Sequence, residues 1–488
     1  MPLTWNLGRN LGTTAALALA LGGCSTMASE GGYGVVGTAP EFATAAVPAE
    51  PQQAKNVILF IGDGMGISTI TAARIYAGQK LGKQGEEHVL PFENFQNVAL
   101  VKTYNTNAQT PDSAGTATAM HSGVKTKIGM LGMGPESISG DCASGVGHEL
   151  PLLGEEVTRR GLALGIVSTA RITHATPASV YARSVDRNWE ADIGIPEGQR
   201  GQMCRDIALQ LAEADFDVAL GGGRAAFYGK DGKGQRLDAA GDLPRQWVAR
   251  TGGSYVRTAA ELAAAPADKP VLGLFSPSHM TYMVDRAETA DSTEPTLTDM
   301  TAAAIARLKP DPQGYYLMVE GGRIDHGHHA GQAGYALEEA VEFARAIQYA
   351  IDNTDPAETL ILVTADHSHV FTISGYPRRG NEILGLVVPP EGGGEDGDTG
   401  DGPTLASDGK PYTTLSYANG PGAVSGQRAM PETGVKARQQ SLVPLGSETH
   451  GGEDVALFGQ GPGAQRVRGV IEQNLIYDII RAAYGWAD

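Results

Sequence analysis

Apolar residues occur along most of this chain in short runs that alternate with segments of helical period. The segments 70–77 and 333–351 have helical character, and the second lies between two apolar runs. Strand-like runs occupy 57–61, 162–167, 218–220, 315–319 and 359–364. This alternation predicts an α/β fold, with a doubly wound, mostly parallel central sheet and helices on both faces.

The N-terminal segment has a different pattern. An apolar stretch at 11–21 follows Arg9 and is too short to span a bilayer, which is typical of a signal-peptide core. It closes with Leu21-Gly22-Gly23-Cys24, which resembles a bacterial lipobox. We therefore expect residues 1–24 to be a lipoprotein signal with lipidation at Cys24, and the protein to be exported to the periplasm or outer membrane. An ordinary cleaved signal with a chance cysteine is the alternative.

Residues 25–54 are rich in Ala, Gly, Thr and Pro and show no apolar periodicity, so they predict a flexible tether. The remaining residues, 55–488, would form the catalytic domain. Membrane contact is expected only through the N-terminal lipid.

Carboxylates, imidazoles and hydroxyls follow several of the predicted strands. In open α/β sheets, ligands bind beyond the carboxyl ends of the strands. Carboxylates and imidazoles together suit zinc. Each residue alone has an ordinary structural explanation, such as a turn aspartate or a helix cap, so their joint placement carries the prediction of a multi-metal hydrolase. They are Asp63, His174, Thr176, Glu320, Asp325, Asp366 and His367.

Spacing refines the metal prediction. Asp325 and His329 stand four residues apart, so on a helical turn they share a face and can bind one ion. His326 and His328 point elsewhere and need not be ligands. His450 is distant in sequence but could complete the same zinc site.

Ser113 is the candidate nucleophile. Pro111 breaks the preceding segment, and the small residues 114–120 can form a helix that presents Ser113 at its N-terminus, where backbone N–H groups favour an anion. A neighbouring metal would activate the hydroxyl. The alternative is that Asp112 or Ser113 merely caps the helix.

Charge and cysteine content add two expectations. The chain has 37 Lys and Arg against 55 Asp and Glu, a formal charge of -18, which opposes nucleic-acid binding. If Cys24 carries lipid, Cys142 and Cys204 form an even pair, and a disulfide is the simplest interpretation for an exported protein. Two unrelated buried thiols are the alternative. The acidic, glycine-rich segment 391–402 lacks the period of known calcium loops and predicts a flexible loop.

From about residue 55 to 485 the chain resembles the alkaline phosphatase family, and most closely its mammalian-type branch. The matching stretches occur in family order and cover 56–66, 112–114, 173–178, 319–329 and 448–454. The resemblance implies an alkaline phosphatase-like fold with a crown-like insertion at about 374–447, near the site mouth and a dimer interface. A homodimer is implied as well.

The resemblance also implies residue roles and a cofactor set of two Zn²⁺ and one Mg²⁺ per subunit. Ser113 would be the phosphorylated nucleophile and Arg187 the phosphate clamp. Asp112, His174 and His326 would lie behind the ligands, and Cys142 and Cys204 would form that branch's disulfide. The implied metal ligands are Asp325, His329 and His450 for the first zinc, Asp63, Asp366 and His367 for the second, and Asp63, Thr176 and Glu320 for magnesium.

One departure concerns calcium. Ser276 stands where the mammalian-type branch has a carboxylate, although Asp291 is retained. We therefore expect no structural calcium.

The implied activity is metal-dependent hydrolysis of phosphate monoesters through a phosphoserine, which releases inorganic phosphate and an alcohol. Two alternatives remain: a phosphodiesterase of the same superfamily, and a noncatalytic lipid-anchored protein that binds metal or phosphate. A sulfatase is opposed, because the residues after Ser113 lack the Pro and Arg that such a site needs.

Overall fold

The computed structural model describes residues 53–201, 204–289, 291–392 and 402–486. The expected lipidation site at Cys24, nearly all of the tether 25–54 and most of the acidic loop 391–402 lie outside these residues. Within the described part of the chain, no helix is long and apolar enough to cross a bilayer.

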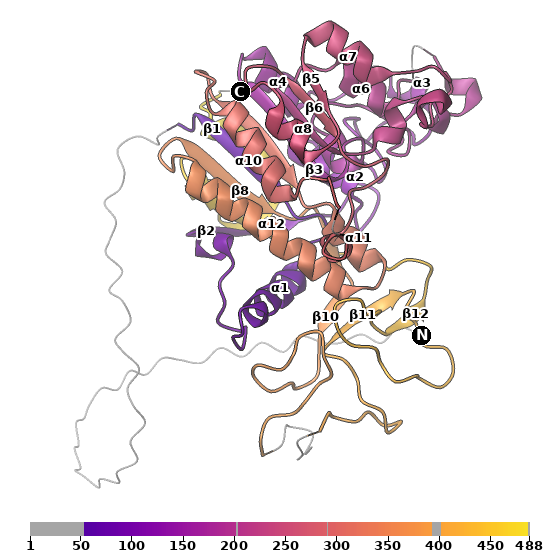
Figure 1. Cartoon of the computed structure of the whole chain (residues 1–488), viewed down its shortest axis with the longest axis vertical. Coiled ribbons are helices and arrows are strands. Elements are labelled where there is room, and N and C mark those ends of the chain that lie inside the picture. The colour runs from indigo at the N-terminus through magenta and orange to yellow at the C-terminus, as the bar shows by residue number, and fades with distance from the viewer. Residues whose placement is uncertain (1–52, 202–203, 290, 393–401, 487–488) are drawn as a thin grey trace, which may run out of the picture. The chain divides into compact units, whose positions relative to one another are not determined.

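The chain is built around a ten-stranded sheet, whose strands run side by side behind helices such as α10 and α12 in Figure 1. All neighbouring strands pair in parallel except β14, which runs antiparallel to both β2 and β8. The expected mostly parallel sheet is therefore confirmed. From one edge to the other, the strands are β15 (Gly469–Glu472), β2 (Asn97–Lys102), β14 (Val455–Gln460), β8 (Thr359–Thr364), β1 (Asn56–Ile61), β7 (Tyr315–Glu320), β3 (Ala163–Arg171), β4 (Val218–Gly222), β6 (Val271–Leu274) and β5 (Ser254–Val256).

The central strands are apolar except at their ends, because both faces of the sheet are covered. Every residue of β1, β7 and β8 is buried. When both faces of a parallel sheet are covered, the sequence of each strand is a nearly continuous hydrophobic run, and this is the pattern seen here.

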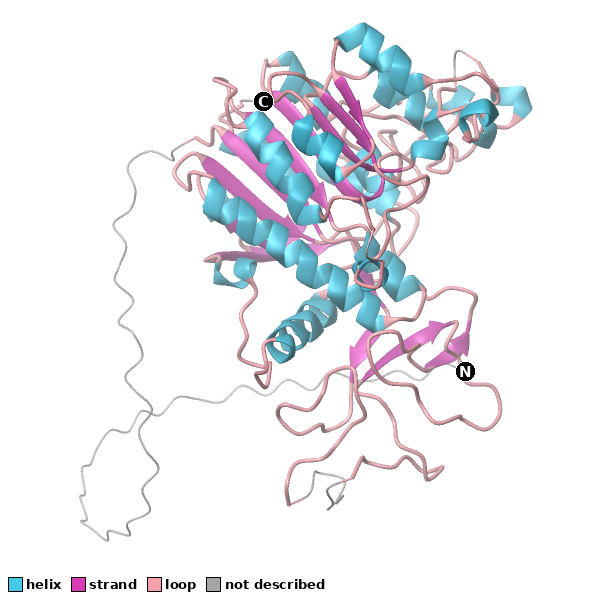
Figure 2. Cartoon of the chain, viewed as in Figure 1, coloured by secondary structure: helices cyan, strands magenta, loops and turns pink. Residues whose placement is uncertain are grey.

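Helices cover both faces of this sheet (Figure 2). α12 packs against both α1 and α10, and α2 contacts α4, α5 and α13 in a second group. The helices are α1 (Ile67–Lys80), α2 (Ser113–Ser122), α3 (Cys142–Gly145), α4 (Leu153–Arg159), α5 (Ala175–Ala178), α6 (Ile207–Glu213), α7 (Leu243–Thr251), α8 (Ala259–Ala264), α9 (Met283–Arg286), α10 (Leu297–Leu308), α11 (Arg323–His329), α12 (Ala333–Asn353) and α13 (Leu475–Ala483).

Most of residues 374–447, the segment expected to be an insertion, folds beyond α11 around a small sheet of its own (Figure 1). That sheet has the order β10 (Phe371–Ile373), β11 (Leu415–Gly420) and β12 (Ser441–Pro444). The chain then returns to the main sheet through β13 (His450–Gly451), which pairs with β9 (Ser368–His369). This short pairing sets His450 opposite His369.

Cys142 and Cys204 form a disulfide, with their Cα atoms 5.8 Å apart. The expected bridge is therefore confirmed. Both cysteines belong to a small apolar cluster that includes Trp189 and Val185. The bridge thus lies beside the segment that carries Arg187.

Candidate active site

The polar residues predicted at strand ends meet at one edge of the sheet. Strand register explains their proximity, because Ile61 of β1 lies opposite Thr364 of β8 on one side and Glu320 of β7 on the other. Asp63 follows β1 in a turn and Asp366 follows β8. Glu320 and both aspartates are completely buried.

The turn after β1 needs glycine. Gly64 has a φ of +67°, and a Cβ at this position would overlap the His369 imidazole. The Gly64 amide donates to Asp366 Oδ1 at 3.0 Å. Close approach of this turn to the end of β8 is therefore possible only without a side chain.

Asp63, Asp366 and His367 form one group whose possible ligand atoms lie within 4.8 Å of one another. His367 Nε2 is 3.4 Å from Asp63 Oδ1 and 3.2 Å from Asp366 Oδ2. The Ser113 hydroxyl lies 3.1 Å from the same nitrogen. The candidate nucleophile thus borders this group directly.

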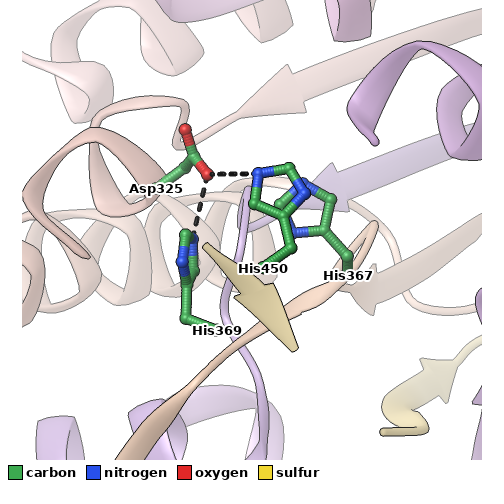
Figure 3. A group of neighbouring side chains, drawn as sticks. All are labelled: Asp325, His367, His369 and His450. Carbon is green, nitrogen blue, oxygen red and sulfur yellow. Dashed lines mark hydrogen bonds and ion pairs between the residues drawn. The ribbon is translucent and has the colours of Figure 1, made fainter. Parts of the chain in front are cut away.

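A second group surrounds Asp325 (Figure 3). α11 places Asp325 and His329 on one face, as the spacing predicted, with His329 Nε2 3.2 Å from Asp325 Oδ1. His450 Nε2 lies 3.5 Å from the same oxygen and 3.1 Å from His329 Nε2. Three potential ligands from α11 and β13 therefore converge.

His369 belongs to this second group, although the sequence analysis passed over it. Its Nε2 lies 2.9 Å from Asp325 Oδ1, and its Nδ1 lies 2.6 Å from Glu448 Oε2. The available signal was the alternation of His367 and His369, since residues two apart in an extended segment share a face. Glu448 was noted only as part of a motif.

The third expected group contains Asp63, Glu320 and Thr176. Asp63 and Glu320 form a possible metal-binding cluster together with His174. Thr176 lies in α5, directly after β3, and is completely buried. Ser168 of β3, which sequence reasoning missed, donates its hydroxyl to Glu320 Oε2.

The buried carboxylates require cations. Burial, together with the negative charges of Asp366, Asp325 and Glu320, raises the pKa of Asp63 well above its usual value. Both Asp63 side-chain oxygens and Asp366 Oδ2 lack a hydrogen-bond partner among the described residues. A divalent ion would satisfy these oxygens and offset their mutual repulsion, so the donor set fits metal ions.

Asp325 differs from Asp63. Although burial opposes ionisation, the interactions of Asp325 with His329, His369 and His450 hold its pKa well below the usual range. This carboxylate is therefore an anion bordered by imidazoles, which is a suitable environment for a borderline metal such as zinc.

Ser113 begins α2, and Asp112 is the N-cap residue, accepting from the Gly115 amide at 3.1 Å. The capping alternative is thus correct for Asp112, and Ser113, which is buried, takes the first position of the helix. Asp112 also accepts from Arg187 Nη1 at 3.0 Å. This ion pair directs the guanidinium toward the helix N-terminus.

His174, His279 and His326 form a further cluster, in which His279 was not predicted. The ring centroids of His279 and His326 are 4.0 Å apart. Arg171 contacts both ring nitrogens of His279, and Arg187 Nη2 lies 3.1 Å from His174 Nε2. The positive charges of these guanidinium groups oppose a cation beside the three rings.

A hollow connects these groups to solvent. Glu190, which was also not predicted, binds Arg171 at 2.6 Å on its wall. The hollow is lined by Ser113, Arg171, His174, Arg187, Asn188, Glu190, Asp325, His326, His329 and His450. The candidate nucleophile Ser113, the candidate phosphate-binding Arg187 and three potential metal ligands therefore face one space.

Residues 54–485 match the alkaline phosphatase family model. The chain is 45% identical over 449 residues to the tissue-nonspecific alkaline phosphatase of Gallus gallus, covering 87% of this chain and 83% of that protein. The chain belongs to the alkaline phosphatase family. The alkaline phosphatase of Gadus morhua is 43% identical, with coverage of 87% and 90%.

The fold agrees with solved alkaline phosphatases. The enzyme from Thermus thermophilus superposes with a TM-score of 0.67 at 24% identity, covering 91% of this chain and 96% of that one. Higher identity to the vertebrate isozymes fits the expected mammalian-type branch. The protein is a metal-dependent hydrolase of phosphate monoesters, and neither the phosphodiesterase nor the noncatalytic alternative is favoured.

Proposed function

We propose that this phosphatase acts through a phosphoserine on Ser113. The observation that carries the proposal is the position of Ser113 at the start of α2, with its hydroxyl 3.1 Å from His367 and its helix capped by Asp112. Backbone N–H groups at a helix N-terminus favour a bound phosphate. In-line attack by Ser113 Oγ on phosphorus would break the ester bond and release the alcohol. Water would then hydrolyse the phosphoserine.

We assign the metal ligands by the three groups described above. Asp325, His329 and His450 would hold the first zinc, and Asp63, Asp366 and His367 the second. Asp63, Thr176 and Glu320 would hold magnesium. When bound, these ions would lower the pKa of the attacking group and stabilise negative charge on phosphate and on the departing oxygen.

Arg187 would bind two phosphate oxygens. Its pKa stays raised because Asp112 lies beside it, although burial acts in the opposite direction. The planar guanidinium forms paired hydrogen bonds that a lysine does not reproduce. Asp112 accepts from Nη1, and Nη2 lies 3.1 Å from His174 Nε2, so the remaining N–H groups of the guanidinium would bind the phosphate.

We further propose a homodimer, export as a lipoprotein anchored at Cys24, and no structural calcium beside Ser276. The lipobox-like sequence supports the anchor, and family membership supports the dimer. A fully coordinated calcium ion near Phe275 and Asp291 would contradict the last point.

The Ser113→Ala variant tests the proposal. It should yield no trapped phosphoenzyme with a labelled phosphate monoester at mildly acid pH, and turnover should fall by at least about 10³-fold, because the nucleophile is lost. Ser122→Ala, in the last turn of the same helix and remote from the metal ligands, is the matched control. Normal turnover in the Ser113 variant would rule out the phosphoserine.

A further inference from the structure

Glu448 contacts the first metal group in three ways but is not one of its proposed ligands. Only 1% of its surface is exposed. It lies between β12 and β13, two residues before His450. Asp325, His329 and His450 come from two distant parts of the chain, so something must fix their mutual orientation. We propose that Glu448 is the positioning residue that orients all three ligands of the first zinc, an inference that rests on the metal assignment proposed above.

The first contact fixes His329. The Glu448 amide donates to the His329 carbonyl at 3.0 Å, and the Glu448 carbonyl accepts from His329 Nδ1 at 2.6 Å. A carbonyl only accepts, so Nδ1 carries the hydrogen. In a neutral ring, Nε2 is then the free lone pair, and this atom faces Asp325 at 3.2 Å. The Glu448 backbone therefore selects the tautomer that can bind a metal.

The second contact fixes Asp325 through His369. Glu448 Oε2 accepts from His369 Nδ1 at 2.6 Å, while Oε1 accepts from the Val370 amide at 2.9 Å. His369 Nε2 then donates to Asp325 Oδ1 at 2.9 Å. Both ring nitrogens of His369 are occupied by carboxylates, so His369 orients Asp325 instead of binding metal itself.

The third contact is through the chain. His450 pairs with His369 across β13 and β9, and Glu448, two residues before His450, holds the β9 side of that pairing through His369 Nδ1 and the Val370 amide. His450 Nδ1 donates to the Pro111 carbonyl at 2.8 Å, which leaves its Nε2 free toward Asp325. Glu448 therefore acts on His450 through the β9–β13 pairing, while the Pro111 carbonyl orients the His450 ring.

A purely stabilising role explains this arrangement less well. Burying a carboxylate and an imidazole costs solvation, and such pairs often add little net stability. Partners behind metal ligands, in contrast, commonly change metal affinity by about 10- to 100-fold when removed. The two roles predict different measurements.

The test compares Glu448→Ala, Glu448→Gln and Glu342→Gln in the zinc-loaded full-length enzyme. Glu342 is a matched control, since it is equally buried but binds the start of α10 through Thr298. Zinc release to a chelator is followed by metal analysis. Glu448→Ala should lose one zinc about 10- to 100-fold more readily than wild type. Glu448→Gln keeps an acceptor for His369 and should show a smaller change, while Glu342→Gln should match wild type.

A kinetic measurement separates positioning from general destabilisation. The first zinc would stabilise the negative charge on the departing oxygen. Glu448→Ala should therefore lower the rate of hydrolysis of phosphate esters of aliphatic alcohols more than that of esters of acidic phenols. Excess zinc should partly restore the rate. His369→Ala should show the same dependence of the rate on the leaving group. The double variant Glu448→Ala with His369→Ala should lose no more activity than either single variant.

Equal zinc release from Glu448→Ala and wild type would overturn the inference. So would an unchanged dependence on the leaving group. If Glu448→Ala does not fold, zinc release and the leaving-group dependence are measured on Glu448→Gln, and these results decide between positioning and a purely stabilising role. Wild-type enzyme that binds no zinc at the Asp325 group would instead contradict the metal assignment itself, so the two failures are distinguishable.

Discussion

The histidines of the site differ in the hydrogen-bond partners of their ring nitrogens, and these partners decide which nitrogen is left free. His329 and His450 each give Nδ1 to a backbone carbonyl and direct Nε2 at Asp325. The two carboxylates that flank His369 outweigh burial and raise its pKa to about 10. His328 is buried, and its two ring nitrogens contact the hydroxyls of Thr69 and Tyr417. Hydrogen-bond partners, and not residue type, therefore determine each role.

Arg187 provides a prediction at this scale. Arg187→Lys should weaken inhibition by inorganic phosphate by about 10- to 100-fold, because a hydrogen bond to a charged group contributes about 1.5–3 kcal/mol. The inhibition constant for phosphate is the measurement. Arg183→Lys is the control, since Arg183 pairs with Glu155 in a more exposed position. An unchanged constant in Arg187→Lys would exclude the clamp.

Single elements place functional groups through their ends. α2 presents Ser113 at its N-terminus, and α11 begins at Arg323, three residues after Glu320 ends β7. The disulfide anchors the loop region beside Arg187. We expect loss of this disulfide to lower the stability of the folded protein more than its catalytic rate.

The disulfide gives a prediction for this region. The bridge joins residues 62 positions apart. In the chain-entropy account, closing such a loop stabilises the folded state by about 4 kcal/mol. Cys142→Ser with Cys204→Ser should therefore lower the thermal midpoint markedly. Thermal unfolding of both forms is the measurement, with reduced wild-type protein as the control. A midpoint equal to that of oxidised wild type would contradict this estimate.

Glu339 on α12 gives a pH prediction. It accepts from the Met283 amide at the start of α9, and burial raises its pKa from 4.5 to about 7. Between these values the unfolded chain loses the proton while the folded protein keeps it. Stability should therefore fall as pH rises from about 4.5 to 7, by on the order of 3 kcal/mol.

Glu339→Gln removes the titratable carboxyl group but keeps an oxygen that can accept from the Met283 amide. Denaturant unfolding at pH 5 and pH 8 should show a smaller loss of stability in this variant than in wild type. Identical losses in the two proteins would show that Glu339 is not the responsible group.

At the scale of the whole molecule, the sheet gathers buried carboxylates that repel one another. Asp63, Asp366 and Glu320 come from adjacent strands and share one buried edge. Their separation in sequence places them on different elements, so only the complete sheet creates the charge cluster. Metal ions therefore stabilise the folded protein as well as serving the reaction.

Metal removal tests this conclusion. Dialysis against a chelator should abolish hydrolysis of p-nitrophenyl phosphate, and zinc with magnesium should restore it. The thermal midpoint should fall as well, since each site at 100 times its dissociation constant contributes about 2.7 kcal/mol. Calorimetry before and after reloading provides the measurement. Full activity after verified removal of the metals would refute metal dependence.

Much of the fold was predictable from local pattern. The runs at 57–61 and 359–364 became β1 and β8, and 333–351 became most of α12, because buried parallel strands and long amphipathic helices have strong signals. The antiparallel placement of β14 was not predicted. Strand direction depends on connections and partners that no local window contains.

The candidate site divides in the same way. Asp325 and His329 could be paired from sequence, since a four-residue spacing fixes a helical face. Glu448, His369 and Ser168 were missed as contributors, because their partners lie on other elements. The Glu448 contact with His369 joins residues 79 positions apart.

The sequence by itself determined the family, the elements and the chemical types of the functional groups, because each depends on local order along the chain. Tertiary structure decided which groups meet, which nitrogen of each histidine is free, and which carboxylate is raised or lowered in pKa. These properties depend on distance, burial and hydrogen-bond partners. All three arise only when β1, β7 and β8 align their ends and β13 brings His450 beside His369.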